Sequence, residues 1–236
     1  MKADPTLSKS AYVQEIFKRI APRYDLMNRL MTGGQDLAWR KQVVRLAKIP
    51  PGGRVLDLGA GTGDLAREAL RQQPSCRPLA ADFTLAMLLC GRRRAAHPEP
   101  ALQWSCADAL NLPFPSETFD ALISGFLLRN VADIDLALRE QLRVLRPGAR
   151  VVALDTTRPL PSPLSPFIRF HMRRVIPFLG GLLTGSRDAY TYLPTSSENF
   201  LTAEDLQKKF QAAGFQQTGF QRLMFGTIAI HWGVKP

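Results

Sequence analysis

Three glycines alternate with other residues at the end of an apolar run, and this spacing suits the binding of a ligand. Residues 54–58 have the β-branched and apolar character of a buried strand. The glycines after this run are Gly59, Gly61 and Gly63. Because they lack a Cβ atom, they allow a tight turn whose backbone approaches a ligand closely. Asp57 precedes the turn and Asp64 follows it, so the site would repel a pyrophosphate and favour a cationic ligand.

The spacing of these glycines differs from that of a dinucleotide-binding turn. Such turns follow the pattern G-x-G-x-x-G, whereas the third glycine here comes one residue early. The order acidic-x-G-x-G-x-G resembles motif I of class I S-adenosylmethionine (SAM) methyltransferases, whose cofactor carries a sulfonium and an ammonium group. The resemblance implies that SAM is the cofactor and that Asp57, Thr62 and the three glycines form part of its site. A glycine-rich turn without a ligand is the alternative.

Further polar residues occur where a SAM site needs them. Asp82 ends a second strand-like run about 20 residues after the glycine turn, where related folds place a ribose-binding carboxylate. Its two oxygens would accept both ribose hydroxyl protons, although an aspartate at a strand end can also cap a helix. Asp108 and Ala109 come after a third strand-like run, and the resemblance implies that they contact the adenine. We also assign Gly125, after a fourth run, to the cofactor site.

Strands and helices alternate around these residues. The expected elements of this core are 53–58, 64–72, 77–82, 84–95, 102–106, 119–124, 134–146 and 149–155. Their alternation predicts an α/β fold with a parallel sheet and helices on both faces. The resemblance implies the Rossmann-like, seven-stranded, mostly parallel sheet of class I SAM methyltransferases. The ligand crevice of such a sheet lies at the carboxyl ends of the strands, where the glycine turn, Asp82 and Asp108 would fall.

N-terminal helices and a cap insertion are expected around this core. The helices span 11–48 and are broken by Pro22 and by the Gly33–Gly34 pair. Four prolines within 158–166 exclude a regular helix or a central strand. We therefore interpret 158–195 as a cap over the crevice.

The chain closes with a helix that Thr202 caps and that runs to Ala213, followed by two strands at 215–224 and 226–234. All parts belong to one domain. It comprises an N-terminal helical region 1–50, a SAM-binding core 51–157, the cap 158–195 and a C-terminal part 196–236.

Length and composition fit one enzyme domain. With 236 residues, of which 45% are hydrophobic, the chain can enclose a sizeable core. Three scattered cysteines indicate neither a disulfide framework nor a zinc site, and the three histidines show no metal-ligand spacing. The first ten residues lack the apolar segment of a signal peptide, and no apolar run approaches the roughly 18 residues of a membrane span. We therefore expect a cytoplasmic protein without a bound metal.

The net charge of +11 predicts attraction to a polyanion, either nucleic acid or an anionic membrane. Residues 1–50 contain ten Lys or Arg against four acids, and residues 158–187 contain five Arg and no acid. In the second region the arginines are interspersed with large apolar side chains, which suits a segment lying on anionic lipid. Stacking aromatics or a known RNA-binding module are not evident. We expect transient contact with an anionic membrane and no nucleic acid, with a generally basic surface as the alternative.

Three phrases of the sequence resemble a narrower family. They are Tyr24–Asn28 with Trp39, Phe126–Val131 and Arg143–Gly148. They are similar to signatures of the ubiquinone/menaquinone biosynthesis C-methyltransferase family, the second of them to its F-G-L-R-N-V stretch. The resemblance covers nearly the whole chain. It implies SAM-dependent methylation of the ring of a polyprenyl quinol, either demethylmenaquinol or a related benzoquinol, by an enzyme that is peripheral at the inner face of the membrane.

The sequence departs from the family pattern in three places. Thr32–Asp36 lacks the serine and the histidine that family members commonly carry there. Gly125 stands where a serine usually precedes F-G-L-R-N-V, and Leu127 replaces the family glycine. The family's Leu-Glu-x-Ser is Leu-Asp-Thr-Thr at 154–157. These changes bear on the substrate more than on the reaction.

Ring methylation requires an electron-rich carbon, so the substrate should be the quinol and not the electrophilic quinone. A quinol hydroxyl has a pKa near that of tyrosine, about 10, and the protein must therefore assist its ionisation. The resemblance implies that Arg129, which stays charged in proteins, stabilises the quinolate directly or through an ordered water. We expect Asn130 and Tyr24 to orient the ring. Asp25 would pair with Arg129 or act as the base.

Other interpretations stay open at this point. A methyltransferase of a phospholipid amine or of a small natural product would share every SAM motif. A non-catalytic assembly protein would be compatible with Gly125 and with the altered stretch at 154–157. An RNA methyltransferase is disfavoured because no N/D-P-P-Y or cysteine-nucleophile motif is visible. For Arg129, a structural salt bridge to Asp133 or Asp135 is the alternative, and the sequence leaves a homodimer open.

Overall fold

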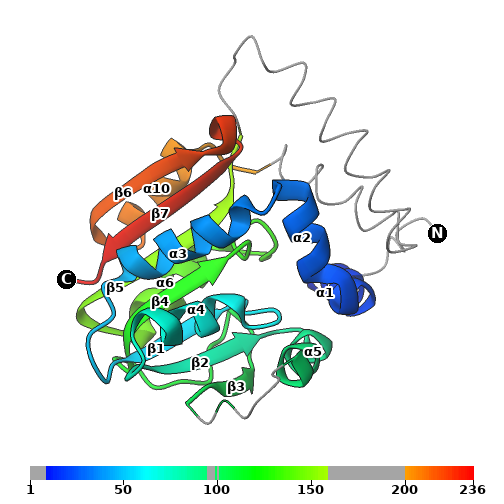
Figure 1. Ribbon diagram of the computed structural model, residues 1–236. Coiled ribbons are helices and arrows are strands. Elements are labelled where there is room, and N and C mark those ends of the chain that lie inside the picture. The colour runs from blue at the N-terminus through cyan, green and yellow to red at the C-terminus, as the bar shows by residue number, and fades with distance from the viewer. Residues whose placement is uncertain (1–8, 95–98, 100, 159–199) are drawn as a thin grey trace.

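A seven-stranded sheet forms the centre of the molecule (Figure 1). The computed structural model describes residues 9–94, 99, 101–158 and 200–236. The strands are β1 (Arg54–Leu58), β2 (Arg77–Asp82), β3 (Gln103–Cys106), β4 (Phe119–Gly125), β5 (Leu145–Thr156), β6 (Gln216–Leu223) and β7 (Ile228–Val234). Their order across the sheet is β3-β2-β1-β4-β5-β7-β6. Among these described strands β7 alone runs opposite to the other six, which confirms the mostly parallel sheet.

The order of the strands reverses at β1. β2 and β3 follow on one side of β1, and β4 lies on the other side. The register places Leu58 of β1 beside Ala81 of β2 and Ser124 of β4, so the three strands end together. In open α/β sheets the ligand crevice forms at such a reversal, outside the carboxyl ends of the strands.

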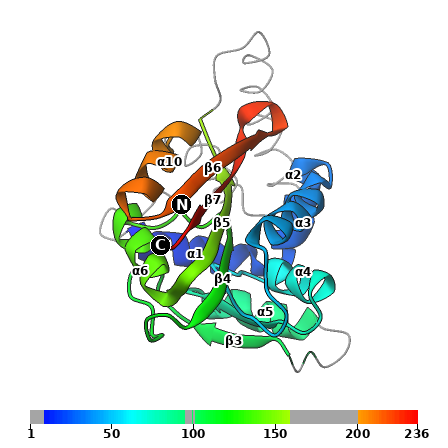
Figure 2. The same cartoon turned by 90° about the vertical axis from the view of Figure 1, so that its left-hand side faces the viewer.

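Helices cover both faces of the sheet (Figures 1 and 2). They are α1 (Lys9–Ile20), α2 (Tyr24–Thr32), α3 (Gln35–Ala47), α4 (Asp64–Gln72), α5 (Leu85–Arg94), α6 (Ile134–Val144) and α10 (Ala203–Ala212). Side chains alternate between the faces of a strand, so Val55 of β1 packs with α3 and α4, while Leu56 packs with α6 and α10. Two separate apolar cores result, one on each side of the sheet.

The N-terminal helices break at the predicted positions. Pro22 lies in a short 3-10 turn, Ala21–Arg23, between α1 and α2. Gly33 and Gly34 separate α2 from α3 and have φ of 58° and 78°, which permits the sharp change of direction. Ile16, Ile20 and Met27 form a small core of their own beside the sheet.

One boundary differs from the prediction. The sequence predicts a helix over 134–146 and a strand from residue 149, but α6 ends at Val144 and β5 begins at Leu145. Leu145 is already extended, with ψ of 146°. Pro147 favours the early end, because a helix continued through it would bring its ring against the carbonyl of Arg143, and because a proline biases the residue before it, Arg146, away from the helical conformation. The first residue of β5 therefore pairs with Phe119 of β4 before the register shifts.

Two sequence-distant residues meet where the expected cap would leave the core. The backbone amide of Arg158 donates to the carbonyl of Leu201 at 3.2 Å, and the Thr157 hydroxyl donates to the same carbonyl at 3.3 Å. Beyond Arg158, the expected cap and the basic stretch 158–187 lie outside the described residues. In the part of the chain that the structure describes, no helix is both long and apolar enough to cross a membrane.

Candidate active site

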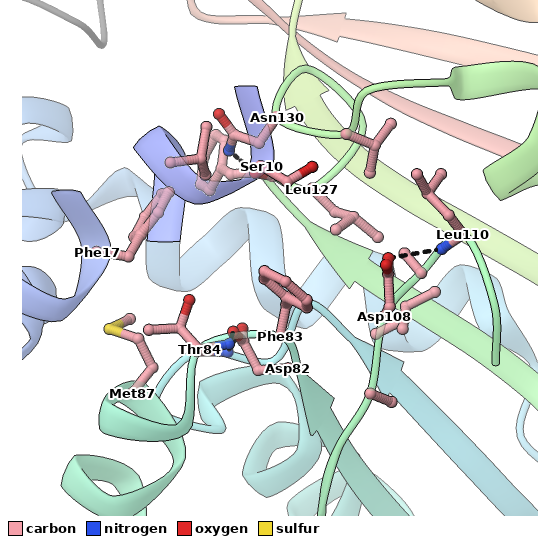
Figure 3. A pocket seen from close by; sticks show the side chains of 18 of the residues that line it. Ser10, Phe17, Asp82, Phe83, Thr84, Met87, Asp108, Leu110, Leu127 and Asn130 are labelled. Atoms are coloured by element: carbon pink, nitrogen blue, oxygen red, sulfur yellow. Dashed lines mark hydrogen bonds between the residues drawn. The ribbon is translucent and has the colours of Figure 1, made fainter. Parts of the chain in front are cut away.

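A cavity lies at the carboxyl ends of β1, β2 and β4, where the strand order reverses (Figure 3). Side chains of α1 and α2 also contribute to its lining. The predicted residues that line it are Tyr24, Gly59, Gly61, Asp82, Asp108, Ala109, Gly125 and Asn130. The predicted residues outside the lining are Asp25, Asp57, Thr62, Gly63 and Arg129. The structure thus brings most of the predicted site to one place.

Positive backbone angles and close neighbours shape the glycine turn. Gly59, Gly61 and Gly63 have φ of 69°, 58° and 83°, values that other residues rarely adopt. A Cβ atom on Gly61 would lie 3.1 Å from Cε of Met87, which lines the cavity. A Cβ atom on Gly63 would lie 2.6 Å from Cη2 of Trp104. Gly61 therefore keeps the cavity open, whereas Gly63 makes room for a tryptophan.

Asp82 links the turn to the cavity. Its Oδ2 accepts a hydrogen bond from the amide of Gly61 at 2.8 Å, and its Oδ1 accepts one from the amide of Thr84 at 2.7 Å. Burial raises the pKa of Asp82, and the two backbone donors oppose this rise. Each carboxylate oxygen has a second lone pair. Asp82 can therefore hold the turn and still accept ribose hydroxyl protons.

Asp57 supports the turn from inside the core. Its side chain is fully buried, and its Oδ2 accepts from the amide of Ala66 in the first turn of α4 at 2.9 Å. Its Oδ1 has no partner among the described residues. Burial raises the pKa of Asp57 to about 7. A nearby cation would lower that pKa again, so the orphaned oxygen fits a positively charged ligand such as SAM and does not fit a pyrophosphate.

Asp108 and Ala109 lie on the side of the cavity next to β3. Oδ1 of Asp108 accepts from the amide of Leu110 at 2.9 Å, as the dashed line in Figure 3 shows. The Asp108 side chain is exposed and Ala109 is buried. An exposed carboxylate with a spare oxygen can accept protons from an amino group, which agrees with the expected adenine contact.

Arg129 is buried and forms an ion pair with Asp155 of β5. Its Nη1 lies 2.7 Å from Oδ1, and its backbone amide donates to Oδ2 at 3.2 Å. The guanidinium carbon lies 4.9 Å from the centroid of the Phe126 ring, and Phe126 lines the cavity. Nε of Arg129 has no hydrogen-bond partner within the described part of the chain. The guanidinium thus adjoins a cavity-lining ring and keeps one unused donor.

The partner of Arg129 differs from both expectations. The expected Asp25–Arg129 pair is not formed, because Asp25 binds Arg94 and accepts from the Thr62 hydroxyl at 2.7 Å. Asp133 caps α6 by accepting from the amide of Leu136, and Asp135 pairs with Lys209. The carboxylate that balances Arg129 lies on the neighbouring strand.

The loop after β4 holds its residues by backbone contacts. Phe126 has a φ of 61° although it is not a glycine, and such strain is often found at functional sites. Its amide donates to the carbonyl of Leu154 at 2.6 Å, and its carbonyl accepts from Nδ2 of Asn130 at 2.8 Å. Asn130 is thereby oriented along the cavity wall.

Tyr24 reaches the cavity from α2. Its ring packs edge-to-face on Phe17, with 5.7 Å between the centroids. Burial raises the pKa of Tyr24, and the side chain of Asn28, one helical turn later, and the charge of Arg129 oppose this rise. Tyr24 therefore stays protonated at neutral pH and acts as a neutral polar group.

Two departures from the family pattern lie at the cavity. A Cβ atom on Gly125 would lie 3.2 Å from Cδ1 of Leu65, so a serine there would need a small shift. A Cβ atom on Gly59 would lie 2.9 Å from Cδ1 of Leu127. The leucine in place of the family glycine therefore fills space against the turn.

Helix α1 is the part of the site that sequence reasoning missed. Val13 and Phe17 line the cavity, although their spacing predicts only an apolar helix face. Lys9 donates from Nζ to the carbonyl of Val131 at 2.6 Å and to that of Arg129 at 3.3 Å. This contact ties α1 to the loop that carries Arg129 and Asn130. Phe83 also lines the cavity, and its position directly after Asp82 was the available signal.

Strand order, glycine turn and acidic residues together define the class of this protein, a class I SAM methyltransferase. A crystal structure of a SAM-dependent methyltransferase from Thermotoga maritima shares this fold with a TM-score of 0.65. The identity is 18%, and the match covers 94% of this chain and 99% of that chain.

The model of the ubiE/COQ5 methyltransferase family matches residues 5–235, and the chain belongs to that family. The ubiquinone/menaquinone biosynthesis C-methyltransferase UbiE of Desulfotalea psychrophila is 45% identical over 97% of this chain and 92% of its own length. The demethylmenaquinone methyltransferase of Thermus thermophilus is 44% identical over 94% of this chain and 100% of its own length.

Proposed function

We propose that this protein transfers the methyl group of SAM to a ring carbon of a polyprenyl quinol, demethylmenaquinol or a related benzoquinol, in respiratory quinone biosynthesis. The observation that carries the proposal is the single cavity that Gly61, Asp82 and Asp108 share with Tyr24 and Asn130. The names of the full-length relatives support the same reaction and disfavour a phospholipid amine or a scaffold role. The enzyme would work in the cytoplasm and contact the inner face of the membrane transiently.

SAM, when bound, supplies an electrophilic methyl group on its sulfonium. Asp82 would hold the ribose hydroxyls and Asp108 the adenine amino group, since both carboxylates line the cavity with oxygens to spare. Gly61 would let the backbone approach the ligand. Asp57, behind the turn, would supply negative charge that favours a cationic ligand.

Arg129 would stabilise the quinolate that forms when the ring hydroxyl loses its proton. Because Asp155 balances its charge, the guanidinium would act less as a free cation than as a hydrogen-bond donor. A guanidinium N–H that Asp155 does not use would do this through an ordered water that carries the proton, since Arg129 is not in the cavity lining. Asn130 and Tyr24 would orient the ring. Asp25 would position α2, because both of its oxygens are engaged by Thr62 and Arg94.

The test is methyl transfer from labelled SAM to demethylmenaquinol analogues with and without dithionite. Labelling of the ring that depends on the reductant is expected, because only the quinol carries an electron-rich carbon. If SAM binds but no quinol is labelled, the assignment of the cofactor stands and the assignment of the substrate is wrong. Equal labelling of quinone and quinol would contradict the quinolate mechanism.

A further inference from the structure

Helix α2 exposes two leucines on one face. Leu26 is 53% exposed and Leu30 is 47% exposed, and residues four apart project from the same side of a helix. Leu37 is the third residue of α3, the helix that follows the tight Gly33–Gly34 turn, and is 43% exposed. Single exposed leucines are common on protein surfaces, but a group within so short a stretch marks an interaction site. We call Leu26, Leu30 and Leu37 the leucine face.

Exposed basic side chains outnumber exposed acids along the N-terminal helices α1 to α3, of which α2 and α3 carry the leucine face. Between residues 9 and 48 the exposed basic residues are Lys9, Lys18, Arg19, Arg23, Lys41, Arg45 and Lys48. Glu15 is the exposed acid of this described stretch. Its other acids, Asp25 and Asp36, are balanced by ion pairs with Arg94 and Arg40. An exposed apolar group within a positive field fits an anionic lipid surface.

The same helices form one wall of the cavity. Val13 and Phe17 of α1 and Tyr24 of α2 face it, while the leucine face is turned to solvent. Figure 1 shows α1 and α2 beside the strand ends that hold the cavity. A ligand that leaves a bilayer at this surface would therefore be next to the site.

We propose that the leucine face docks on an anionic lipid bilayer and that the surrounding lysines and arginines hold it there. The proposal rests on the proposed function for its purpose, since a polyprenyl tail must be delivered from a membrane. Charge complementarity selects this partner. A second copy of the chain would bring a surface of the same charge, which would repel this one. A nucleic acid would attract the basic residues, but its phosphate backbone would not bury the three leucines.

Co-sedimentation with vesicles of phosphatidylcholine and phosphatidylglycerol tests the docking directly. For Leu26→Gln/Leu30→Gln we expect the partition coefficient to fall at least tenfold, because burying one leucine is worth about one power of ten. The control is Phe225→Gln, a side chain that is 74% exposed in the turn between β6 and β7. This control should bind vesicles like the wild type.

A second variant tests the basic residues. Lys18→Glu/Arg19→Glu should weaken binding to anionic vesicles and leave the weak binding to phosphatidylcholine alone unchanged. High salt should weaken the wild type in the same way. Retained binding in the leucine variant, or equal losses in the leucine variant and the Phe225→Gln control, would overturn the proposal. So would light scattering that shows a dimer dissociated by the leucine substitutions.

Activity separates this proposal from the function on which it rests. With a tail-less quinol in solution, all three variants should match the wild type within about twofold, which also shows that they fold. With a long-tailed quinol in vesicles, the leucine variant should lose activity in parallel with binding. If the wild type binds vesicles but methylates no quinol, the result contradicts the proposed function and leaves the docking proposal intact. If the wild type methylates soluble quinol but does not bind vesicles, the result contradicts the docking proposal and leaves the proposed function intact.

Discussion

Arg129 owes its position to a carboxylate on the neighbouring strand. Asp155 accepts hydrogen bonds from both Nη1 and the backbone amide of Arg129. This pair therefore fixes the Arg129 side chain and the backbone of the loop after β4 together. A buried pair of this kind contributes little net charge to its surroundings. The chemistry expected of Arg129 therefore depends on where its remaining N–H groups point.

For Arg129→Ala we expect kcat to fall at least about a hundredfold, the scale of losing one oxyanion donor. The SAM dissociation constant should change less than about threefold, because Arg129 does not line the cavity. Steady-state kinetics and calorimetry measure the two quantities. Equal losses in both would assign Arg129 a structural role.

Arg129→Lys is the matched control, since Arg129→Ala leaves the Asp155 charge buried without a partner. A lysine restores the charge pair but offers no Nε–H in the same place. We expect it to recover the free energy of unfolding without recovering turnover. Full recovery of kcat would mean that charge alone suffices.

His231 makes the stability of the fold depend on pH. The residue is buried in β7, its Nε2 lies 2.9 Å from the carbonyl of Ala203, and burial lowers its pKa. The unfolded chain therefore binds a proton more readily than the folded one. The contribution of His231 to the free energy of unfolding is therefore complete above its ordinary pKa of about 6.5. This contribution is lost as the pH falls below that value.

We expect urea denaturation to show a free energy of unfolding that declines from about pH 7 to pH 5 more steeply in the wild type than in His231→Gln. The variant lacks the titrating group, so only the remaining groups contribute to its slope. Identical slopes in the two proteins would show that His231 titrates alike in both states.

Helices α2, α4 and α5 are held together by one arginine. Arg94 at the end of α5 binds Asp25 of α2, the Thr62 hydroxyl at 3.0 Å, and Asp64 of α4 at 2.9 Å. Arg29 and Arg40 approach Asp64 from α2 and α3, and together with Arg94 they keep the pKa of Asp64 below its ordinary value. The helical wall of the cavity is thus attached to the glycine turn by charge.

Arg94→Ala should weaken SAM binding by roughly tenfold, about the effect of losing one charged hydrogen bond. It should also speed amide hydrogen exchange in α2, because Asp25 and Asp64 then repel each other. Arg92→Ala, two residues earlier and exposed, is the control and should change neither quantity. Faster exchange with unchanged SAM affinity would mean that α2 is not needed for the cofactor.

The elements were predictable because breakers mark their ends. Pro22, Gly33–Gly34 and Gly214 each separate a helix from the next element of the chain, and Thr202 starts α10 as expected. The function of α1 was not predictable in this way. An apolar stripe at helical spacing indicates that a face is covered, but not whether it covers a sheet or a cavity.

The arrangement of the whole molecule followed from alternation and from the glycine turn, and the structure confirms both. Contacts between distant segments did not follow. The sequence points to Asp133 and Asp135 as partners of Arg129, because they are closer along the chain than Asp155. The pairing of β4 with β5 is what brings Arg129 and Asp155 together. Sequence patterns describe local conformation well, whereas such partners depend on the register of strands far apart in the chain.

Charge is also a property of the whole molecule. A formal +11 raises encounter rates with any anionic surface and makes them sensitive to ionic strength. In our proposal, the leucine face orients the protein on the membrane surface to which this charge attracts it.

The hydrogen bond between Arg158 and Leu201 joins the last described residue before 159–199 to the second residue after that segment. We therefore predict that the segment between these two residues can be replaced while the strands of the sheet keep their positions. A chimaera in which a linker of about five residues replaces 159–199 should unfold cooperatively and still bind SAM, since shortening a loop changes its closure entropy only slightly. If the deleted segment is the predicted cap, the chimaera should lose quinol turnover. Grafting the corresponding segment of a relative would then transfer substrate preference onto an unchanged cofactor site.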